Sequence, residues 1–169
     1  SATSALSTAG GGRIQFKAGT FDFGTTNAAF NTVNDIVFEG EGIDATIIQN
    51  SSDAAADTEP LSFTNSKRIT IRDLTVSAGG ASRISSDAID FDQGDDVLVE
   101  RVKVTASRGR GIVIDGKDTA ATADRGIIRD CIITGTVDDG IELLGANQVT
   151  ISGCKIYDVG GHGINLSKA

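Results

Sequence analysis

Residues 138–166 read DDGIELLGANQVTISGCKIYDVGGHGINL and contain one repeat followed by the start of the next. The Asp-Gly-Ile-Glu-Leu of residues 139–143 returns as His-Gly-Ile-Asn-Leu at residues 162–166, 23 positions later. Apolar and polar residues alternate within each copy, which is typical of a strand with one buried face. The stretch therefore predicts a fold of short strands stacked on one another, one copy for each unit of the repeat.

The same unit extends towards the N-terminus through residues 61–76, 89–104 and 111–133. Phe91 of the second copy and Ile114 of the third copy align and are 23 positions apart. Ile114 and Leu143, which lies in the copy at residues 141–156, are 29 positions apart because residues 115–125 form a longer loop. Alignment of the copies gives five apolar columns: Ile89, Ile112, Ile141, Ile164; Phe91, Ile114, Leu143, Leu166; Ile71, Val99, Ile128, Ile151; Leu74, Val102, Cys131, Cys154; and Val76, Val104, Ile133, Ile156.

Two solenoid classes fit a repeat of about 23 residues, the leucine-rich repeats and the parallel β-helices. The leucine-rich class requires a helical segment and regularly placed Leu and Asn, which these copies lack. Short strands joined by Gly, Asn and Asp turns favour an all-β, single-stranded parallel β-helix. We therefore predict that residues 1–169 form a single domain of this kind, as part of a longer chain or an assembly.

A solenoid of strands exposes an unpaired edge at each end, and such edges are usually capped. Ala2, Ala5, Leu6 and Ala9 share one helical face, so we expect a short N-terminal capping helix. Residues 163–166 begin a further rung that no cap follows. We expect a continuation of the chain, or another copy in a homo-oligomer, to cover that edge.

Composition argues against several classes of partner. The net charge is −8, so no basic stripe is present to neutralise the phosphates of a nucleic acid or of an anionic membrane. No apolar run approaches the roughly 18 residues of a membrane span. Cys131 and Cys154 are 23 positions apart and share a column, so we expect two free thiols stacked in the core, with a disulfide between rungs as the alternative.

Two stretches resemble a known superfamily. ALSTAGGGRIQFKAGTFDF at residues 5–23 resembles the helix, Gly-rich turn and first strand that open pectin-lyase-like right-handed parallel β-helix proteins, and residues 139–156 resemble their generic rung. The superfamily includes polysaccharide enzymes and phage tailspikes. The resemblance covers nearly all of the chain and implies a right-handed helix, a polysaccharide partner and a location outside the cell or on a virion surface.

Two enzyme branches offer more particular matches. Polygalacturonases carry Asn-Thr-Asp, Asp-Asp and Gly-His-Gly, which resemble SSD at 85–87, DD at 138–139 and GHG at 161–163. Here a Ser replaces the Asn, and a whole rung carrying Arg110 intervenes between the first two motifs. Mannuronan epimerases and related lyases have an Asp and a His that correspond to Asp139 and His162, but their catalytic Tyr falls where Arg110 stands. Neither catalytic set is complete in this chain.

The residues that directly precede the repeated strand form a second line along the solenoid, about 4.8 Å apart: Asp87, Arg110, Asp139 and His162. For a hydrolase, Asp139 would be the general acid, Asp138 or Asp87 the base, and His162 an orienting partner. For a lyase or epimerase, Arg110 or His162 would remove a proton beside a carboxylate, and Asp139 would assist directly or through Ca²⁺. We expect the adjacent outward residues to bind sugar hydroxyls or a cation: Asp90, Glu142 and Asn165.

The same residues have a non-catalytic interpretation. Asp is common in turns before Gly, and a solenoid that repeats its turns stacks their charges automatically. Aromatic platforms for sugars are also scarce, because the chain has one Tyr and seven Phe. Two functions are therefore open: a polysaccharide-processing module of the hydrolase or lyase and epimerase type, or a structural or receptor-binding β-helix of a phage tailspike or adhesin.

Overall fold

The computed structural model describes residues 10–24, 28–51, 58–79, 86–116 and 125–167, and every regular element in those ranges is a β-strand. The strands are β1 (Gly12–Gln15), β2 (Gly19–Asp22), β3 (Ala29–Asn31), β4 (Asn34–Glu39), β5 (Thr46–Gln49), β6 (Leu61–Thr64), β7 (Lys67–Ser77), β8 (Ile89–Asp92), β9 (Val97–Thr105), β10 (Ile112–Asp115), β11 (Arg125–Arg129), β12 (Ile132–Thr134), β13 (Ile141–Leu144), β14 (Gln148–Ser152), β15 (Lys155–Tyr157) and β16 (Ile164–Ser167).

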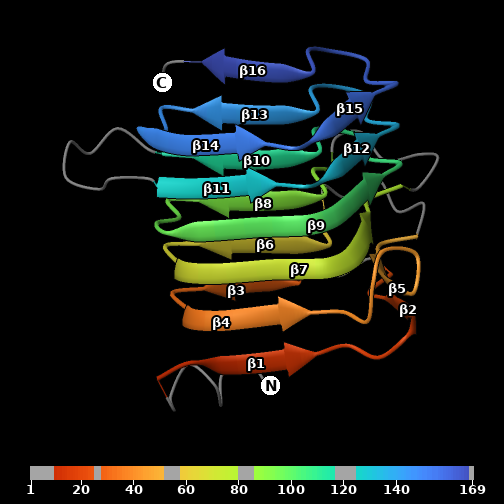
Figure 1. Ribbon diagram of the computed structural model, residues 1–169, viewed down its shortest axis with the longest axis vertical. Coiled ribbons are helices and arrows are strands. Elements are labelled where there is room, and N and C mark those ends of the chain that lie inside the picture. The colour runs from red at the N-terminus through yellow and green to blue at the C-terminus, as the bar shows by residue number, and fades with distance from the viewer. Residues whose placement is uncertain (1–9, 25–27, 52–57, 80–85, 117–124, 168–169) are drawn as a thin grey trace.

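All strand pairs are parallel, and the strands form two sheets that run the length of the molecule (Figure 1). One sheet has the order β16-β13-β10-β8-β6-β3. The other follows β1-β4-β7-β9-β11-β14, and its far part continues through β2, β5, β12 and β15. Each turn of the chain contributes one strand to the first sheet and two strand segments to the second, which is the predicted parallel β-helix.

A tight corner divides the second sheet into its two parts. The long strands β7 and β9 pass through this corner at Asp73 and Arg101, whose φ angles are 56° and 49°. The equivalent residues in the next two rungs are Asp130 at 54° and Gly153 at 64°. The left-handed conformation recurs at the same point of four rungs because a single residue there redirects the strand.

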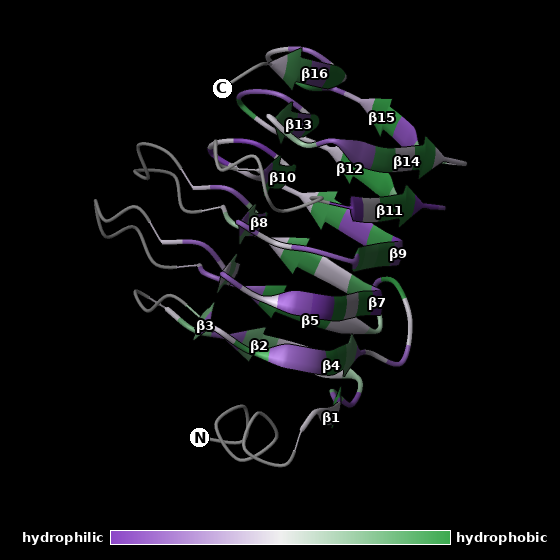
Figure 2. Cartoon of the chain, turned by 90° about the vertical axis from the view of Figure 1, so that its left-hand side faces the viewer, coloured by the Kyte–Doolittle hydropathy of each residue, from purple (hydrophilic) through white to green (hydrophobic). Residues whose placement is uncertain are grey.

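The register confirms the five apolar columns. Ile112 pairs with Ile89 on one side and with Ile141 on the other, and Ile141 pairs with Ile164. The column residues from Ile71 to Ile141 are almost fully buried, and the rings of Phe63 and Phe91 stack with centroids 5.1 Å apart. Figure 2 shows apolar and polar residues side by side within single strands such as β9. The alternation in the sequence therefore sorts each strand into an inner and an outer face.

Outward-facing charges form ladders on the second sheet. Arg72 lies 2.9 Å from Glu39 in the preceding rung and 3.7 Å from Glu100 in the following rung. Glu100 is also bound by Arg129 at 2.5 Å. Alternating charges in stacked rungs thus pair with each other well away from the column of Asp87 and Arg110.

The remaining expectations have mixed outcomes. Cys131 and Cys154 are free thiols in adjacent rungs, as predicted. The expected capping helix falls on residues 1–9, which lie outside the described residues. Ile164 and Leu166 continue two inner columns, yet 45% and 73% of their surface is exposed because no described strand pairs with the far side of β16. A further rung or a second copy over this edge stays a prediction.

No helix long and apolar enough to cross a membrane occurs in the part of the chain that the structure describes.

Candidate functional site

The four residues before the repeated strands are stacked as predicted. Backbone hydrogen bonds set their register: Gly111 N donates to Asp139 O at 3.0 Å, and Gly140 N donates to His162 O at 2.8 Å. Ala88 N likewise donates to the carbonyl of Arg110. Asp87, Arg110, Asp139 and His162 therefore occupy equivalent places just before β8, β10, β13 and β16, strands whose N-terminal ends lie on the same side of the molecule in Figure 1.

Glycines beside this column let the rungs approach closely. A Cβ atom on Gly111 would lie 2.4 Å from the carbonyl oxygen of Gly140, and one on Gly161 would lie 2.4 Å from Asp139 Oδ1. These distances are far below van der Waals contact, so a larger residue would push the rungs or the carboxylate apart. The Gly-rich turns of the sequence are thus required by the packing of the site.

Asp139 and His162 form a dyad. Oδ1 of Asp139 accepts hydrogen bonds from the backbone N of His162 at 2.6 Å and from its ring Nδ1 at 3.1 Å. The Asp139 side chain is 6% exposed, whereas that of His162 is 76% exposed. Burial raises the pKa of Asp139, but the hydrogen bonds from His162 and Asn165 outweigh burial and hold that pKa below its ordinary value. The carboxylate is therefore ionised, and the outer nitrogen of the ring is left facing solvent.

Asn165 and Glu142 support the dyad from the neighbouring strand positions. Asn165 Nδ2 donates to Asp139 Oδ2 at 2.7 Å and to Glu142 Oε1 at 3.1 Å. Ser167 Oγ also donates to Glu142 Oε1, at 3.3 Å. Two of the three residues predicted to contact sugar or a cation are thus bound to other protein groups, and Ser167 joins them without any signal in the sequence analysis.

Arg110 joins the first and third rungs of the column. It donates to Asp87 through Nε at 3.1 Å and Nη2 at 2.7 Å, and it contacts Glu142 Oε2 through Nη1. Burial lowers the pKa of Arg110, but the hydrogen bonds to the two carboxylates outweigh burial and raise that pKa above its ordinary value. The guanidinium stays protonated, which gives no support to the role of Arg110 as a base.

Asp90 and Asp138 lie at the margins of this network. Burial, reinforced by the negative charges of Asp87, Glu59 and Asp92, raises the pKa of Asp90 to about 7. Val113 on β10 is only 1% exposed, and it pairs with Asp90 on β8 on one side and with Glu142 on β13 on the other. Asp138 is exposed, and its carbonyl oxygen accepts hydrogen bonds from the backbone N of Gly161 and from Thr136 Oγ1.

The network brings together most of the predicted residues. Six of them are joined by side-chain hydrogen bonds across four rungs: Asp87, Arg110, Glu142, Asn165, Asp139 and His162. Asp90 and Asp138 are not joined to it by any described side-chain hydrogen bond. Ser85 of the SSD motif lies outside the described residues.

A metal site is not evident in the parts of the chain that the structure describes, where no group of three or more His, Cys, Asp and Glu side chains is placed to hold an ion. The carboxylates of the network are instead bound to Arg110, Asn165 and His162. Participation of Ca²⁺ stays a prediction.

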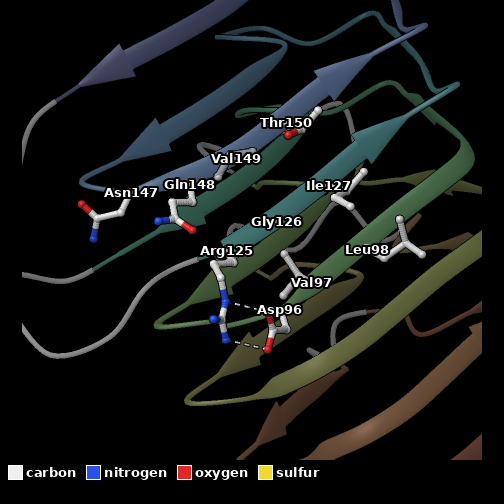
Figure 3. Close-up of a pocket in the computed structure, with 10 residues that line it drawn as sticks. All are labelled: Asp96, Val97, Leu98, Arg125, Gly126, Ile127, Asn147, Gln148, Val149 and Thr150. Carbon is white, nitrogen blue, oxygen red and sulfur yellow. Dashed lines mark hydrogen bonds and ion pairs between the residues drawn. The ribbon is translucent and has the colours of Figure 1, made fainter.

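A separate cavity of about 540 Å³ lies on the outer face of β9, β11 and β14 (Figure 3). Leu98 and Ile127 contribute apolar side chains to it, and the ion pair between Arg125 and Asp96 stands at its edge, with Nε 2.7 Å from Oδ1. None of the predicted site residues lines it. In the sequence, Leu98 and Ile127 are apolar residues at paired positions outside the buried columns. An alignment made to find buried columns does not single out such positions, so the cavity was not predicted.

Solved structures with a similar fold include two modules that act on polysaccharide. The A-module of the Azotobacter vinelandii mannuronan C-5 epimerase AlgE6 superposes with a TM-score of 0.74 at 17% identity, over 96% of this chain and 52% of that chain. The corresponding module of AlgE4 from the same organism gives 0.69 at 19% identity, over 98% and 47%. The chain thus spans about half the length of each neighbour, and the likeness concerns the fold.

No curated protein has a sequence that matches the chain. The family model described as the right-handed β-helix region matches residues 59–169, which include every rung from β6 onward. This match and the parallel three-segment rungs agree with each other, so the chain belongs to the right-handed β-helix family.

Proposed function

We propose that the chain is a polysaccharide-modifying module of the lyase or epimerase class, in which His162 removes a proton beside a uronate carboxylate. The observation that carries this proposal is the dyad of the buried Asp139 and the exposed His162. Because Nδ1 faces an ionised carboxylate, it carries the ring proton, and the lone pair of Nε2 points outward. An imidazole in this state is a general base.

The proton transfer has a defined course. Nε2 of His162 takes the proton from the carbon next to the carboxylate, and the electron pair of that bond moves into the carboxylate group. Asp139 stabilises the imidazolium that forms, as an orienting carboxylate does in a catalytic triad. In a lyase, a carbon-carbon double bond then forms as the C–O bond to the linked sugar breaks, and the departing oxygen takes a proton from the imidazolium or from water. In an epimerase, water returns a proton to the opposite face of the carbon, and the imidazolium releases its proton to solvent.

Arg110 provides a place for the substrate carboxylate. Three of the five N–H groups of its guanidinium donate to Asp87 and Glu142, which leaves two for an anion. Its charge would stabilise the negative charge that builds on the uronate during proton removal. Asp87 would then act by holding the guanidinium in place.

The polysaccharide-acting neighbours support this class of function. A hydrolase is less well supported, because Asp139 would have to donate a proton while the hydrogen bonds of the site lower its pKa. We place the module outside the cell, where polymers of uronic acids are accessible.

Deuterium exchange tests the proposal at the step shared by lyases and epimerases. A panel of polyuronates is incubated with the protein in D₂O, and NMR measures deuterium at the carbon beside the carboxylate. Ultraviolet absorbance detects the unsaturated ends that a lyase forms, and an assay for reducing ends detects hydrolysis. We expect exchange with at least one polymer, lowered about 10²–10⁴-fold in His162→Gln. The control Asp130→Asn changes an exposed corner residue and is expected to keep full activity.

A structural β-helix is the second candidate function. The paired ladders on other faces favour it, because Arg101 binds Asp73 at 2.7 Å much as Arg110 binds Asp87. Stacked charges therefore pair in this solenoid without any catalytic purpose. Absence of exchange, elimination and hydrolysis with every polymer would favour this candidate, whereas activity that survives in His162→Gln would show that His162 is not the base.

A further inference from the structure

Asn165 lies between two carboxylates that belong to the preceding rung. Its Nδ2 atom is 2.7 Å from Oδ2 of Asp139 and 3.1 Å from Oε1 of Glu142. Only an NH₂ group fits both contacts, because the opposite orientation of the amide would place its carbonyl oxygen against two carboxylate oxygens. Both hydrogens of the amide are therefore used within the protein.

The two oxygens of Asp139 have separate partners. Oδ1 binds the backbone amide and the ring of His162, and Oδ2 binds Asn165. A carboxylate fixed at both oxygens cannot rotate about its terminal bond without breaking one set of hydrogen bonds. The contact to Asn165 thus determines how Oδ1 faces the imidazole.

Glu142 anchors the other side of Asn165. Its Oε1 accepts hydrogen bonds from Asn165 and Ser167, and its Oε2 contacts the guanidinium of Arg110. The positive charge of Arg110 offsets the repulsion between carboxylates that would otherwise face one another across the rungs. Asn165 is consequently the one described side chain that links the dyad to the ion-paired half of the column.

We propose that Asn165 is a positioning residue, which fixes the carboxylate of Asp139 so that the ring of His162 keeps its proton on Nδ1 and its base nitrogen outward. This role differs from the sugar contact expected from the sequence, because only the amide oxygen of Asn165 is left for a ligand. Its effect on catalysis rests on the proposed function, whereas its effect on the imidazole does not.

His162 is the only histidine of the chain, so ¹⁵N NMR reports on this one ring without overlap. We expect the neutral ring of the wild-type protein to carry its proton on Nδ1. In Asn165→Ala, rotation of Asp139 releases Nδ1, and the signals move towards the Nε2–H form that histidine prefers in water. Circular dichroism and thermal unfolding establish that each variant is folded.

Ser167→Ala is the matched control. Ser167 lies on the same strand and donates to the same Glu142 oxygen, but it makes no hydrogen bond to Asp139. We expect its ring signals to equal those of the wild type. A folded Asn165→Ala protein with the wild-type tautomer would overturn the proposal, and so would an equal shift in Ser167→Ala.

Kinetics on any polymer that is turned over give the second measurement. A positioning residue acts through the base, so Asn165→Ala is expected to lower kcat by about 10-fold to 100-fold with little change in KM. A rise in KM at constant kcat would instead identify a sugar contact and overturn the positioning role. If no polymer reacts, the proposed function fails, while the NMR result still decides the role of Asn165.

Discussion

The carboxylate of Asp139 binds both the backbone amide and the ring of His162 through a single oxygen, at 2.6 Å and 3.1 Å. This contact joins the residue before β13 to the residue before β16, and only one of the two glycines that flank His162 lies against it. Gly161 faces the carboxylate, whereas Gly163 faces only the side chain of Ile156.

Gly161→Ala is expected to displace the Asp139 carboxylate. The new Cβ would lie 2.4 Å from Oδ1, so the carboxylate or the turn must move, at a cost of about 1–3 kcal/mol in the free energy of unfolding. Chemical denaturation measures that cost, and the NMR signals of the His162 ring report the movement. Gly163→Ala is the control, because its Cβ would lie 3.8 Å from Ile156. Equal effects of the two substitutions would contradict this account.

Arg110→Gln is expected to lower the free energy of unfolding by about 2–4 kcal/mol. The side chains of Asp87 and Glu142 are only 8% and 11% exposed, and without Arg110 they would be buried charges that lack their cation. Urea denaturation at neutral pH measures the loss. Arg68→Gln provides the comparison, since it removes a similar two-bond contact to Asp35 where both side chains are about half exposed. A loss as large in Arg68→Gln would contradict the role of burial.

The stacking of the site could be predicted from the sequence because the backbone register alone determines it. Residues 23 or 29 positions apart occupy the same place in successive rungs, so the line from Asp87 to His162 follows from spacing. The core columns follow in the same way. A repeat specifies which residues are neighbours, and the structure confirms that part.

The hydrogen-bond partners could not be predicted, because long side chains reach beyond their own position in a column. Arg110 reaches forward to Glu142 as well as back to Asp87, and Asn165 binds Asp139 as well as the residue it pairs with. The spacing also placed Asp90 and Glu142 at equivalent outward positions and therefore predicted the same surroundings for both side chains. Their surroundings differ, because only Glu142 is bound to Arg110 and Asn165.

The two thiols are expected to differ in reactivity. Burial raises the pKa of Cys131 to about 12, so it is not ionised at pH 8, whereas Cys154 lies nearer the surface in the adjacent rung. In the native protein, a thiol reagent is expected to modify Cys154 before Cys131, and peptide mass spectrometry measures the order. Urea serves as the control, because both thiols become equally accessible when the chain unfolds. Faster labelling of Cys131 in the native state would contradict its burial.

Asp90→Asn is expected to stabilise the protein at high pH only. In the unfolded chain this carboxyl loses its proton near its ordinary pKa of 3.8. In the folded chain, burial and the charges of Asp87, Glu59 and Asp92 raise its pKa to about 7. The charge of Arg110 lowers this pKa but does not outweigh the other causes. Ionisation therefore favours unfolding progressively from about pH 4 to 7, and the penalty is complete above that range.

The Asn side chain has nearly the same shape and no charge, so the variant escapes this penalty. At pH 8 its free energy of unfolding is expected to exceed that of the wild type by about 1–3 kcal/mol, and the difference is expected to vanish near pH 4. Urea denaturation at both pH values measures it. Asp90→Leu also removes the charge and is expected to show the same dependence on pH. A difference that stays constant from pH 4 to pH 8 would show that the carboxyl ionises alike in both states and would contradict the raised pKa of Asp90.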